Sequence, residues 1–338
     1  MNLHLNNILK DIKKDGVQAY LLTQFTNIEY ISGYKPTSFA FCILKENPII
    51  YVSGMDMEIA NRDSTIEVKQ YESYDLMIKE LKEEGIKNLA IEPTLPYSTY
   101  ARFKDDFEIS DKSYVDKQRM IKTPSEIEKI TKATEIAQKS FLQLDILNNN
   151  GTEREVAFNL VRYMIDNGAS KESFETIVTS GANSSLPHAI PEAKKLERPI
   201  LIDWGAIFKG YCSDNTRTIV YAESQQEIWD IVAEAHDKAI KSVKVGMKCC
   251  EVDKVARDII AEYGYGDNYI HSTGHSLGLN IHETPGFSAR DETVIEKGMV
   301  ITVEPGIYLE GKFGVRLEDT VIISKKANVI GDLPLNIE

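Results

Sequence analysis

The chain has 338 residues, of which 42% are hydrophobic and 27% charged, and its formal net charge at pH 7 is −13. This length is about twice the ~150 residues of a typical domain, so we expect two domains with separate apolar cores. The acidic balance argues against binding to nucleic acid or to an anionic membrane surface, because both need clustered positive charge. We expect the partner to be a small molecule.

The first segment, residues 1–16, interleaves charged side chains with Leu and Ile and lacks the continuous apolar core of a secretory signal. No later stretch approaches the ~18 uninterrupted apolar residues of a membrane-spanning helix. We therefore expect a cytoplasmic protein that binds no membrane. The four cysteines have no C-x-x-C spacing and are expected to be reduced packing residues.

The N-terminal third of the chain alternates charged, helix-like segments with short apolar runs. The apolar runs lie at 19–22, 39–44, 49–52 and 89–91. This alternation predicts a small α/β domain. The apolar pattern breaks near residue 118, so we expect an N-terminal α/β domain over 1–118 and a second domain over 119–338.

Two pairs of helices are predicted in the second domain. They cover residues 123–146, 152–168, 227–243 and 251–263. Pro124 stands where a missing N–H is harmless, and Thr152 with Glu155 forms a capping box. The order helix, helix, strands, helix, helix, strands hints at a duplicated half-domain, although the residues show no strong repeat.

A β-hairpin is predicted around the dipeptide Lys209-Gly210, which separates two β-rich runs. If these two residues form the loop, Asp203 lies opposite Thr216. Because side chains alternate along a strand, Asp203 and Asp214 then project from the same face as diagonal neighbours. Two carboxylates so close repel each other unless a cation lies between them.

Three further candidate ligands lie beside strand-like runs. Glu304 follows the apolar run 299–303 and precedes Pro-Gly, so it lies where a strand ends. Glu318 lies in another such run, and Arg316, two residues earlier, is on the same face. His275 has glycines nearby, which let the backbone approach a crowded centre.

The candidate ligands combine four carboxylates with one imidazole. They are Asp203, Asp214, His275, Glu304 and Glu318. Such an oxygen-rich set predicts two divalent metal ions, with Mn²⁺ preferred and Co²⁺, Zn²⁺ or Fe²⁺ as alternatives. The four carboxylates cancel the charge of two ions, and a bridging hydroxide would be the nucleophile. A single Asp or Glu is a solvated surface residue in roughly 90% of cases, but unpaired carboxylates beside buried strands are costly.

Five segments in this order resemble the catalytic domain of the pita-bread metallopeptidases. They are SGANSSLPHAIP, LIDWGAIFKGYCSDNTRT, STGHSLGLNIHETPG, GMVITVEPGIY and GVRLEDT. That family includes Xaa-Pro dipeptidase (prolidase), aminopeptidase P, methionine aminopeptidase and the metal-free creatinase. The resemblance covers roughly 120–335, and the N-terminal domain resembles the non-catalytic creatinase/prolidase-type domain. It implies an α/β (α+β) fold with a C-terminal pita-bread domain.

The resemblance also implies roles for individual residues. Asp203 and Asp214 would bind one metal ion and His275 the other. Glu304 and Glu318 would bridge the ions or be shared by them, and Glu304 would also move the proton during catalysis.

Three further residues match positions around the substrate in this family. His188 would contact the substrate or the tetrahedral intermediate, and His282 would lie near the scissile carbonyl or the proline. Arg316 would hydrogen-bond the acidic centre, although alone it could be an ordinary salt-bridging strand residue. A lone histidine is more often packed or exposed than catalytic, by about 4:1. We expect His271 to orient the site at most, and His4 and His236 to lie on the surface.

Two departures from the family pattern concern the segment around His275. Ser276 replaces the usual glycine after the metal-binding histidine. Gly286 stands where some prolidases carry an arginine that holds the free carboxylate of a dipeptide. The loss of that arginine leaves the preference for dipeptides open.

The resulting hypothesis is metal-dependent hydrolysis of Xaa-Pro bonds in small proline-containing peptides, by an Xaa-Pro dipeptidase. An aminopeptidase P that acts on longer peptides is the first alternative. The extra N-terminal domain disfavours a methionine aminopeptidase. A non-catalytic binding protein or a creatinase-like enzyme would have lost metal ligands, and all five are present. The family also implies a homodimer.

Overall fold

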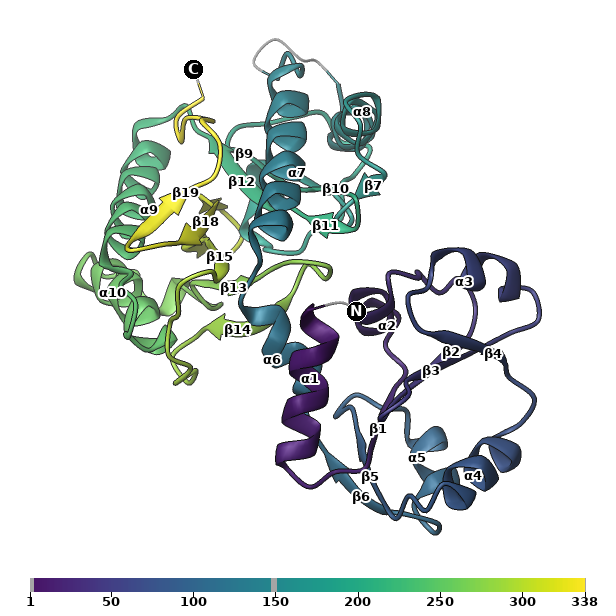
Figure 1. Ribbon diagram of the computed structural model, residues 1–338. Coiled ribbons are helices and arrows are strands. Elements are labelled where there is room, and N and C mark those ends of the chain that lie inside the picture. Colours follow the sequence, from purple (N-terminus) through teal and green to yellow (C-terminus); the bar gives the residue numbers. More distant parts are fainter. Residues whose placement is uncertain (1–2, 147–150, 338) are drawn as a thin grey trace. The chain divides into compact units, whose positions relative to one another are not determined.

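The computed structural model describes residues 3–146 and 151–337, and the chain divides into two compact units, Met1–Arg119 and Met120–Glu338. Each unit contains its own sheets and helices (Figure 1). Among the described residues, no helix combines the length and the apolar character that crossing a bilayer would need.

The N-terminal unit is built on one six-stranded mixed sheet, in the order β4-β3-β2-β1-β5-β6. Its strands are β1 (Ala19–Leu22), β2 (Ala40–Leu44), β3 (Ile49–Val52), β4 (Glu67–Gln70), β5 (Asn88–Ile91) and β6 (Glu108–Asp111). The four predicted apolar runs therefore form β1, β2, β3 and β5. Strands β1 to β3 are buried along their whole length, whereas the edge strands β4 and β6 end in exposed residues.

Helices cover this sheet and supply its core. They are α1 (Leu3–Lys14), α2 (Phe25–Ser32), α3 (Met57–Asp63), α4 (Tyr74–Glu83), α5 (Tyr97–Phe103) and α6 (Tyr114–Met120). Met77 and Leu81 of α4 and Phe103 of α5 pack against Leu21 and Leu89 of the central strands. The predicted small α/β domain is confirmed.

The C-terminal unit contains four smaller sheets. Their orders are β11-β10-β7, β12-β9-β8, β14-β13-β15-β18-β19 and β16-β17. The strands are β7 (Lys171–Glu172), β8 (Ile177–Ser180), β9 (Ile200–Trp204), β10 (Ala206–Phe208), β11 (Tyr211–Cys212), β12 (Asn215–Ile219), β13 (Gly274–Ser276), β14 (Glu283–Phe287), β15 (Val300–Val303), β16 (Gly306–Leu309), β17 (Phe313–Arg316), β18 (Asp319–Ile323) and β19 (Ala327–Val329).

Two helix pairs cover different halves of these sheets (Figure 1). The helices are α7 (Pro124–Leu142), α8 (Glu153–Asp166), α9 (Glu223–Ser242) and α10 (Cys249–Glu262), with short 3₁₀ helices η1 (Gly181–Ser185) and η2 (Gly266–Asn268). One apolar core joins α7 and α8 to β8, β9 and β12, and another joins α9 and α10 to β15, β17 and β18. The predicted order of helix pairs and strands is confirmed.

The local signals at the helix ends also form as predicted. Thr152 and Glu155 make the expected capping box at the start of α8. Thr123 makes another with Glu126, and Pro124 occupies the first turn of α7. The helix α7 ends at Leu142, earlier than predicted.

The hairpin that carries the first two candidate ligands has the predicted register. Phe208 pairs with Tyr211 and Asp203 with Thr216. Lys209 and Gly210 both have positive φ, 48° and 86°, as a tight two-residue turn of the favoured hand requires.

The prediction that His236 lies on the surface is wrong. His236 belongs to α9 and is only 2% exposed. It follows Val232 by one helical turn and precedes Ala239 by another, so it shares their buried face. Its Nε2 lies 3.4 Å from Oδ2 of Asp319.

Candidate metal centre

The predicted ligands come from separate strands and converge on one point of the C-terminal unit. Ligand atoms of Asp214, His275 and Glu318 lie within 4.8 Å of one another. His275 Nε2 lies 3.5 Å from Asp214 Oδ2 and 3.4 Å from Glu304 Oε1. Asp214 immediately precedes β12, Glu304 follows β15, and Glu318 separates β17 from β18.

Asp203 lies on β9 and enters this group through a different contact. Its Oδ2 accepts a hydrogen bond from Arg316 Nη2 at 2.6 Å. The other oxygen, Oδ1, is buried without a hydrogen-bond partner among the described residues, and so is Oδ1 of Asp214. Buried carboxylate oxygens without partners are costly, which makes both atoms suitable metal ligands.

Thr216 connects the strand of Asp203 to the segment of Glu318. It pairs with Asp203 across the hairpin, and its carbonyl accepts the backbone N–H of Glu318 at 3.1 Å. Its hydroxyl donates to Glu318 Oε2 at 2.7 Å. The next residue, Arg217, is fully buried and donates to the carbonyl of Glu318 at 2.6 Å. These contacts hold Glu318 in place from two sides.

The surroundings of His275 fix the orientation of its ring. Nδ1 lies 3.1 Å from the carbonyl of Ser276, and because a carbonyl only accepts, Nδ1 carries the proton. The lone pair of Nε2 therefore faces the carboxylates, as a metal ligand requires. The backbone N–H of His275 donates to Thr302 Oγ1 at 3.0 Å, and this hydroxyl lies 3.3 Å from Glu304 Oε1.

The electrostatics favour a bound cation. Burial raises the pKa of Asp214 far above its usual value, and the negative charges of Glu318, Asp203 and Glu304 raise it further. Burial also raises the pKa of Glu318, with Glu304 and Asp203 adding to the effect. The pKa of Glu304 is raised by burial, which outweighs the opposing charges of nearby basic groups. Divalent ions would remove this repulsion, so the residues fit a metal centre.

Arg316 anchors a hydrogen-bond network behind the carboxylates. Its Nη1 donates to the hydroxyl of Tyr308 at 2.8 Å, and that hydroxyl donates to His271 Nε2 at 2.9 Å. Nδ1 of His271 lies 2.8 Å from the carbonyl of Ser272 and therefore carries the ring proton. Burial alone would lower the pKa of Arg316, but Tyr308, Asp203 and Glu304 raise it well above its usual value.

The sequence gave no role to Tyr308, although it lies in one of the segments that resemble the family. Its ring and hydroxyl are buried, with 4% exposure. Position along the strand β16 is the only signal that could have marked it, since β16 pairs with the strand that carries Arg316.

The two other predicted histidines lie at the edge of this centre. The rings of His282 and His275 are 4.5 Å apart and nearly perpendicular. Partial burial lowers the pKa of His282, and the neighbouring His275 lowers it further, with a smaller effect from His188. His188 is exposed, and the carbonyl of Pro187 before it lies 3.4 Å from Arg316 Nη1. Both imidazoles could therefore reach a bound ligand.

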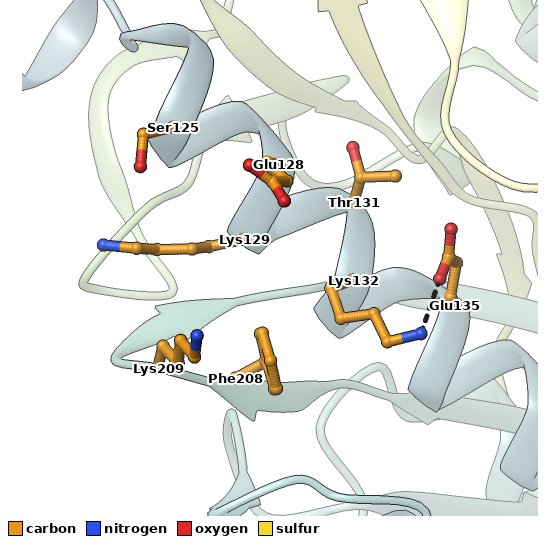
Figure 2. Close-up of a pocket in the computed structure, with 8 residues that line it drawn as sticks. All are labelled: Ser125, Glu128, Lys129, Thr131, Lys132, Glu135, Phe208 and Lys209. Carbon is orange, nitrogen blue, oxygen red and sulfur yellow. Dashed lines mark hydrogen bonds and ion pairs between the residues drawn. The ribbon is translucent and has the colours of Figure 1, made fainter.

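A pocket of about 520 Å³ lies elsewhere in this unit, beside α7 and the tip of the β10–β11 turn (Figure 2). It is lined by Ser125, Glu128, Lys129, Thr131, Lys132, Glu135, Phe208 and Lys209. Lys132 pairs with Glu135 at 3.0 Å, across the rim that Figure 2 shows. None of the candidate ligands lines this pocket, so the chemistry does not belong there.

Comparison with known families divides the chain in a similar way. Residues 4–121 match the creatinase/prolidase N-terminal domain, and residues 128–325 match metallopeptidase family M24. The Xaa-Pro dipeptidase of Pyrococcus horikoshii is 41% identical over 97% of this chain and 96% of its own. The Xaa-Pro dipeptidase of Pyrococcus furiosus is 40% identical over 96% of each chain.

Solved structures show the same two-part fold. The prolidase from Pyrococcus horikoshii superposes with a TM-score of 0.93 at 40% identity, over 98% of this chain and 99% of that one. The X-Pro aminopeptidase from Thermotoga maritima gives a TM-score of 0.92 at 34% identity, over 98% of both chains. The predicted fold is confirmed: a creatinase/prolidase-type domain precedes a pita-bread domain.

Proposed function

The chain belongs to metallopeptidase family M24, and from this premise we propose that it hydrolyses the Xaa-Pro bond of small peptides, as an Xaa-Pro dipeptidase. The observation that carries the proposal is the convergence of Asp214, His275 and Glu318, whose ligand atoms lie within 4.8 Å of one another. A binding protein that had lost the reaction would not need to keep buried carboxylates so close together.

We propose that all five predicted ligands hold two divalent ions. Asp203 and Asp214 would bind one ion and His275 the other, with Glu304 and Glu318 shared between them. Oxygen ligands outnumber the single imidazole, which favours Mn²⁺ over softer ions. When bound, such ions polarise the scissile carbonyl and lower the pKa of a bound water.

The chain's own residues would then position the peptide and move the proton. Burial raises the pKa of Glu304, so this carboxyl group is suited to taking up a proton and donating it to the leaving proline nitrogen. His282 and His188 would donate hydrogen bonds to the oxygen that becomes negatively charged. Arg316 would hold Asp203 in place, since the two are 2.6 Å apart.

The choice between a dipeptidase and an aminopeptidase depends on the end of the substrate beyond proline. Relatives that are named Xaa-Pro dipeptidase support the first choice. Gly286 supports the second, because it pairs with His275 on the adjacent strand and offers no cation for a free carboxylate. Its N–H donates instead to Asp291 at 2.9 Å.

The decisive test is the cleavage of Xaa-Pro dipeptides against Xaa-Pro-Yaa tripeptides by purified protein loaded with Mn²⁺, Co²⁺, Zn²⁺ or Fe²⁺. A dipeptidase should release proline from the dipeptides with the higher kcat/KM. A preference for tripeptides would assign an aminopeptidase, and cleavage of neither would refute the proposal. Methionine release from peptides without proline would instead indicate a methionine aminopeptidase.

We further propose that the protein acts as a cytoplasmic homodimer, as the family resemblance suggests. Light scattering of the purified protein should then give twice the chain mass of 38.1 kDa. A mass of one chain at micromolar concentration would refute the dimer.

A further inference from the structure

Lys122 is a buried cation close to the candidate metal centre, in the segment that leads into α7. It is 4% exposed, and its backbone N–H donates to the carbonyl of Gly298 at 2.9 Å. Its Nζ lies 2.8 Å from Ser276 Oγ and 3.3 Å from Glu283 Oε2. A buried ammonium group is stable only when such partners replace its water, so the three residues form one polar unit.

The two partners of Lys122 hold special places in the sequence. Ser276 follows His275, the candidate metal ligand, and Glu283 follows His282, the histidine beside it. Ser276 and Glu283 also face each other across the β13–β14 pair, where the register shifts after His275. Lys122 therefore contacts the residue after each of two imidazoles whose ring centres are 4.5 Å apart.

Both partners are tied to the backbone around the histidines. Ser276 Oγ donates to the carbonyl of Val300 at 2.9 Å, which joins β13 to β15. Glu283 Oε1 accepts the N–H of Asn280 at 3.0 Å, inside the turn that leads to His282. The ring of His282 is exposed, so its place depends on this backbone more than on packing.

We propose that Lys122 is a positioning residue for His275 and His282: its ammonium group clamps the segment after each imidazole and so sets their separation. The serine at position 276 is part of this clamp, because a glycine there would offer Lys122 no oxygen. The proposal rests on the proposed function for the roles of the two histidines.

The first test is Co²⁺ titration of a Lys122→Met variant, followed by the visible absorption of the bound ion. We expect the dissociation constant to rise about 10-fold to 100-fold, as is typical when an outer-shell partner of a metal ligand is lost, and the absorption bands to shift. The matched control is Lys132→Met, which breaks an exposed ion pair with Glu135. Unchanged Co²⁺ affinity and absorption, with only a lower melting temperature, would show that Lys122 serves stability alone.

A double variant separates position from charge. Lys122→Met combined with Glu283→Gln leaves no unpaired charge, and the glutamine can still accept the N–H of Asn280. Positioning by Lys122 predicts that Co²⁺ binding stays weak in this protein. Recovery of the parental affinity would mean that the unpaired Glu283 caused the whole effect, which would overturn the proposal.

If Lys122→Met does not fold, Ser276→Gly provides the test, because it removes one partner of the clamp and keeps the cation. We expect several-fold weaker Co²⁺ binding, and parental affinity would refute the clamp. These titrations need no peptide cleavage. A parent protein that binds Co²⁺ but cleaves no Xaa-Pro peptide would refute the proposed function and leave this test valid.

Discussion

Arg316 holds Asp203 by one oxygen: Nη2 donates to Oδ2 at 2.6 Å, and Oδ1 remains buried without a partner. The same guanidinium group donates to Thr216 and to Tyr308. One side chain thus bonds three groups around the centre, and a planar fork is needed to reach them.

We predict that Arg316→Lys weakens metal binding about 10-fold to 100-fold, because a lysine keeps the charge but cannot bond Asp203, Thr216 and Tyr308 together. Calorimetric titration of the chelator-treated protein with Mn²⁺ measures the effect. Arg162→Lys, at an exposed position of α8, is the control and should bind like the parent. Parental affinity in Arg316→Lys would show that Asp203 is positioned by its strand alone.

Tyr308 connects Arg316 to His271, and its removal should leave both without a partner. Burial raises the pKa of Tyr308 to about 12, so its hydroxyl stays protonated in any ordinary assay. We predict that Tyr308→Phe lowers the free energy of unfolding by about 1–3 kcal/mol, measured by urea denaturation. The alkaline limb of the kcat/KM profile should not move, and a shifted limb would mean that Tyr308 titrates during turnover. Tyr221→Phe, at an exposed tyrosine, serves as the control.

The sequence predicts the ligand hairpin well because its geometry is local. A two-residue loop at Lys209-Gly210 determines every pair along the two strands, and the observed pairing of Asp203 with Thr216 follows from it. The capping box of Thr152 and Glu155 is equally local, since both partners lie within one helical turn.

The contacts that the sequence did not predict join distant segments. Lys122 and Glu283 are 161 positions apart, and neither has a periodic pattern that marks it as buried. His236 was misplaced because a histidine on an amphipathic helix tolerates either face, and its burial follows from how α9 packs. The roles of the site residues remain predictions, which the experiments above and below address.

Metal removal should destabilise the protein more at high pH than at low pH. Burial raises the pKa of Asp214, Glu304 and Glu318, so without metal the folded state prefers their protonated forms. Their contribution to stability is therefore present at low pH and is lost as the pH rises through the raised values.

We predict that the difference in melting temperature between metal-loaded and chelator-treated protein is larger at pH 8 than at pH 5.5. Scanning calorimetry at both pH values measures this difference. Glu318→Gln removes one of the repelling charges and should narrow the gap at pH 8. A gap that stays constant between the two pH values would contradict the proposed repulsion among the carboxylates.

His236 should make the protein sensitive to acid. Burial lowers the pKa of His236 to about 4, against the opposing charge of Asp319 and with help from Arg217. The unfolded chain binds a proton near pH 6.5, whereas the folded protein resists it until about pH 4. The stability that this histidine contributes is thus complete above pH 6.5 and is lost as the pH falls towards 4, with a total of about 3 kcal/mol.

The matched variant is His236→Gln, which keeps a polar side chain near Asp319 but does not titrate. Urea unfolding of both proteins, in chelator at a series of pH values between 7.5 and 4, gives two curves of unfolding free energy. The parent should lose up to about 3 kcal/mol more than the variant across this range, because only the parent's unfolded state gains a proton at position 236. Chelator keeps metal release out of the comparison, and the carboxylates titrate in both proteins, so their effect cancels in the difference. Parallel curves would mean that His236 is protonated in the folded protein and pairs with Asp319 as a cation.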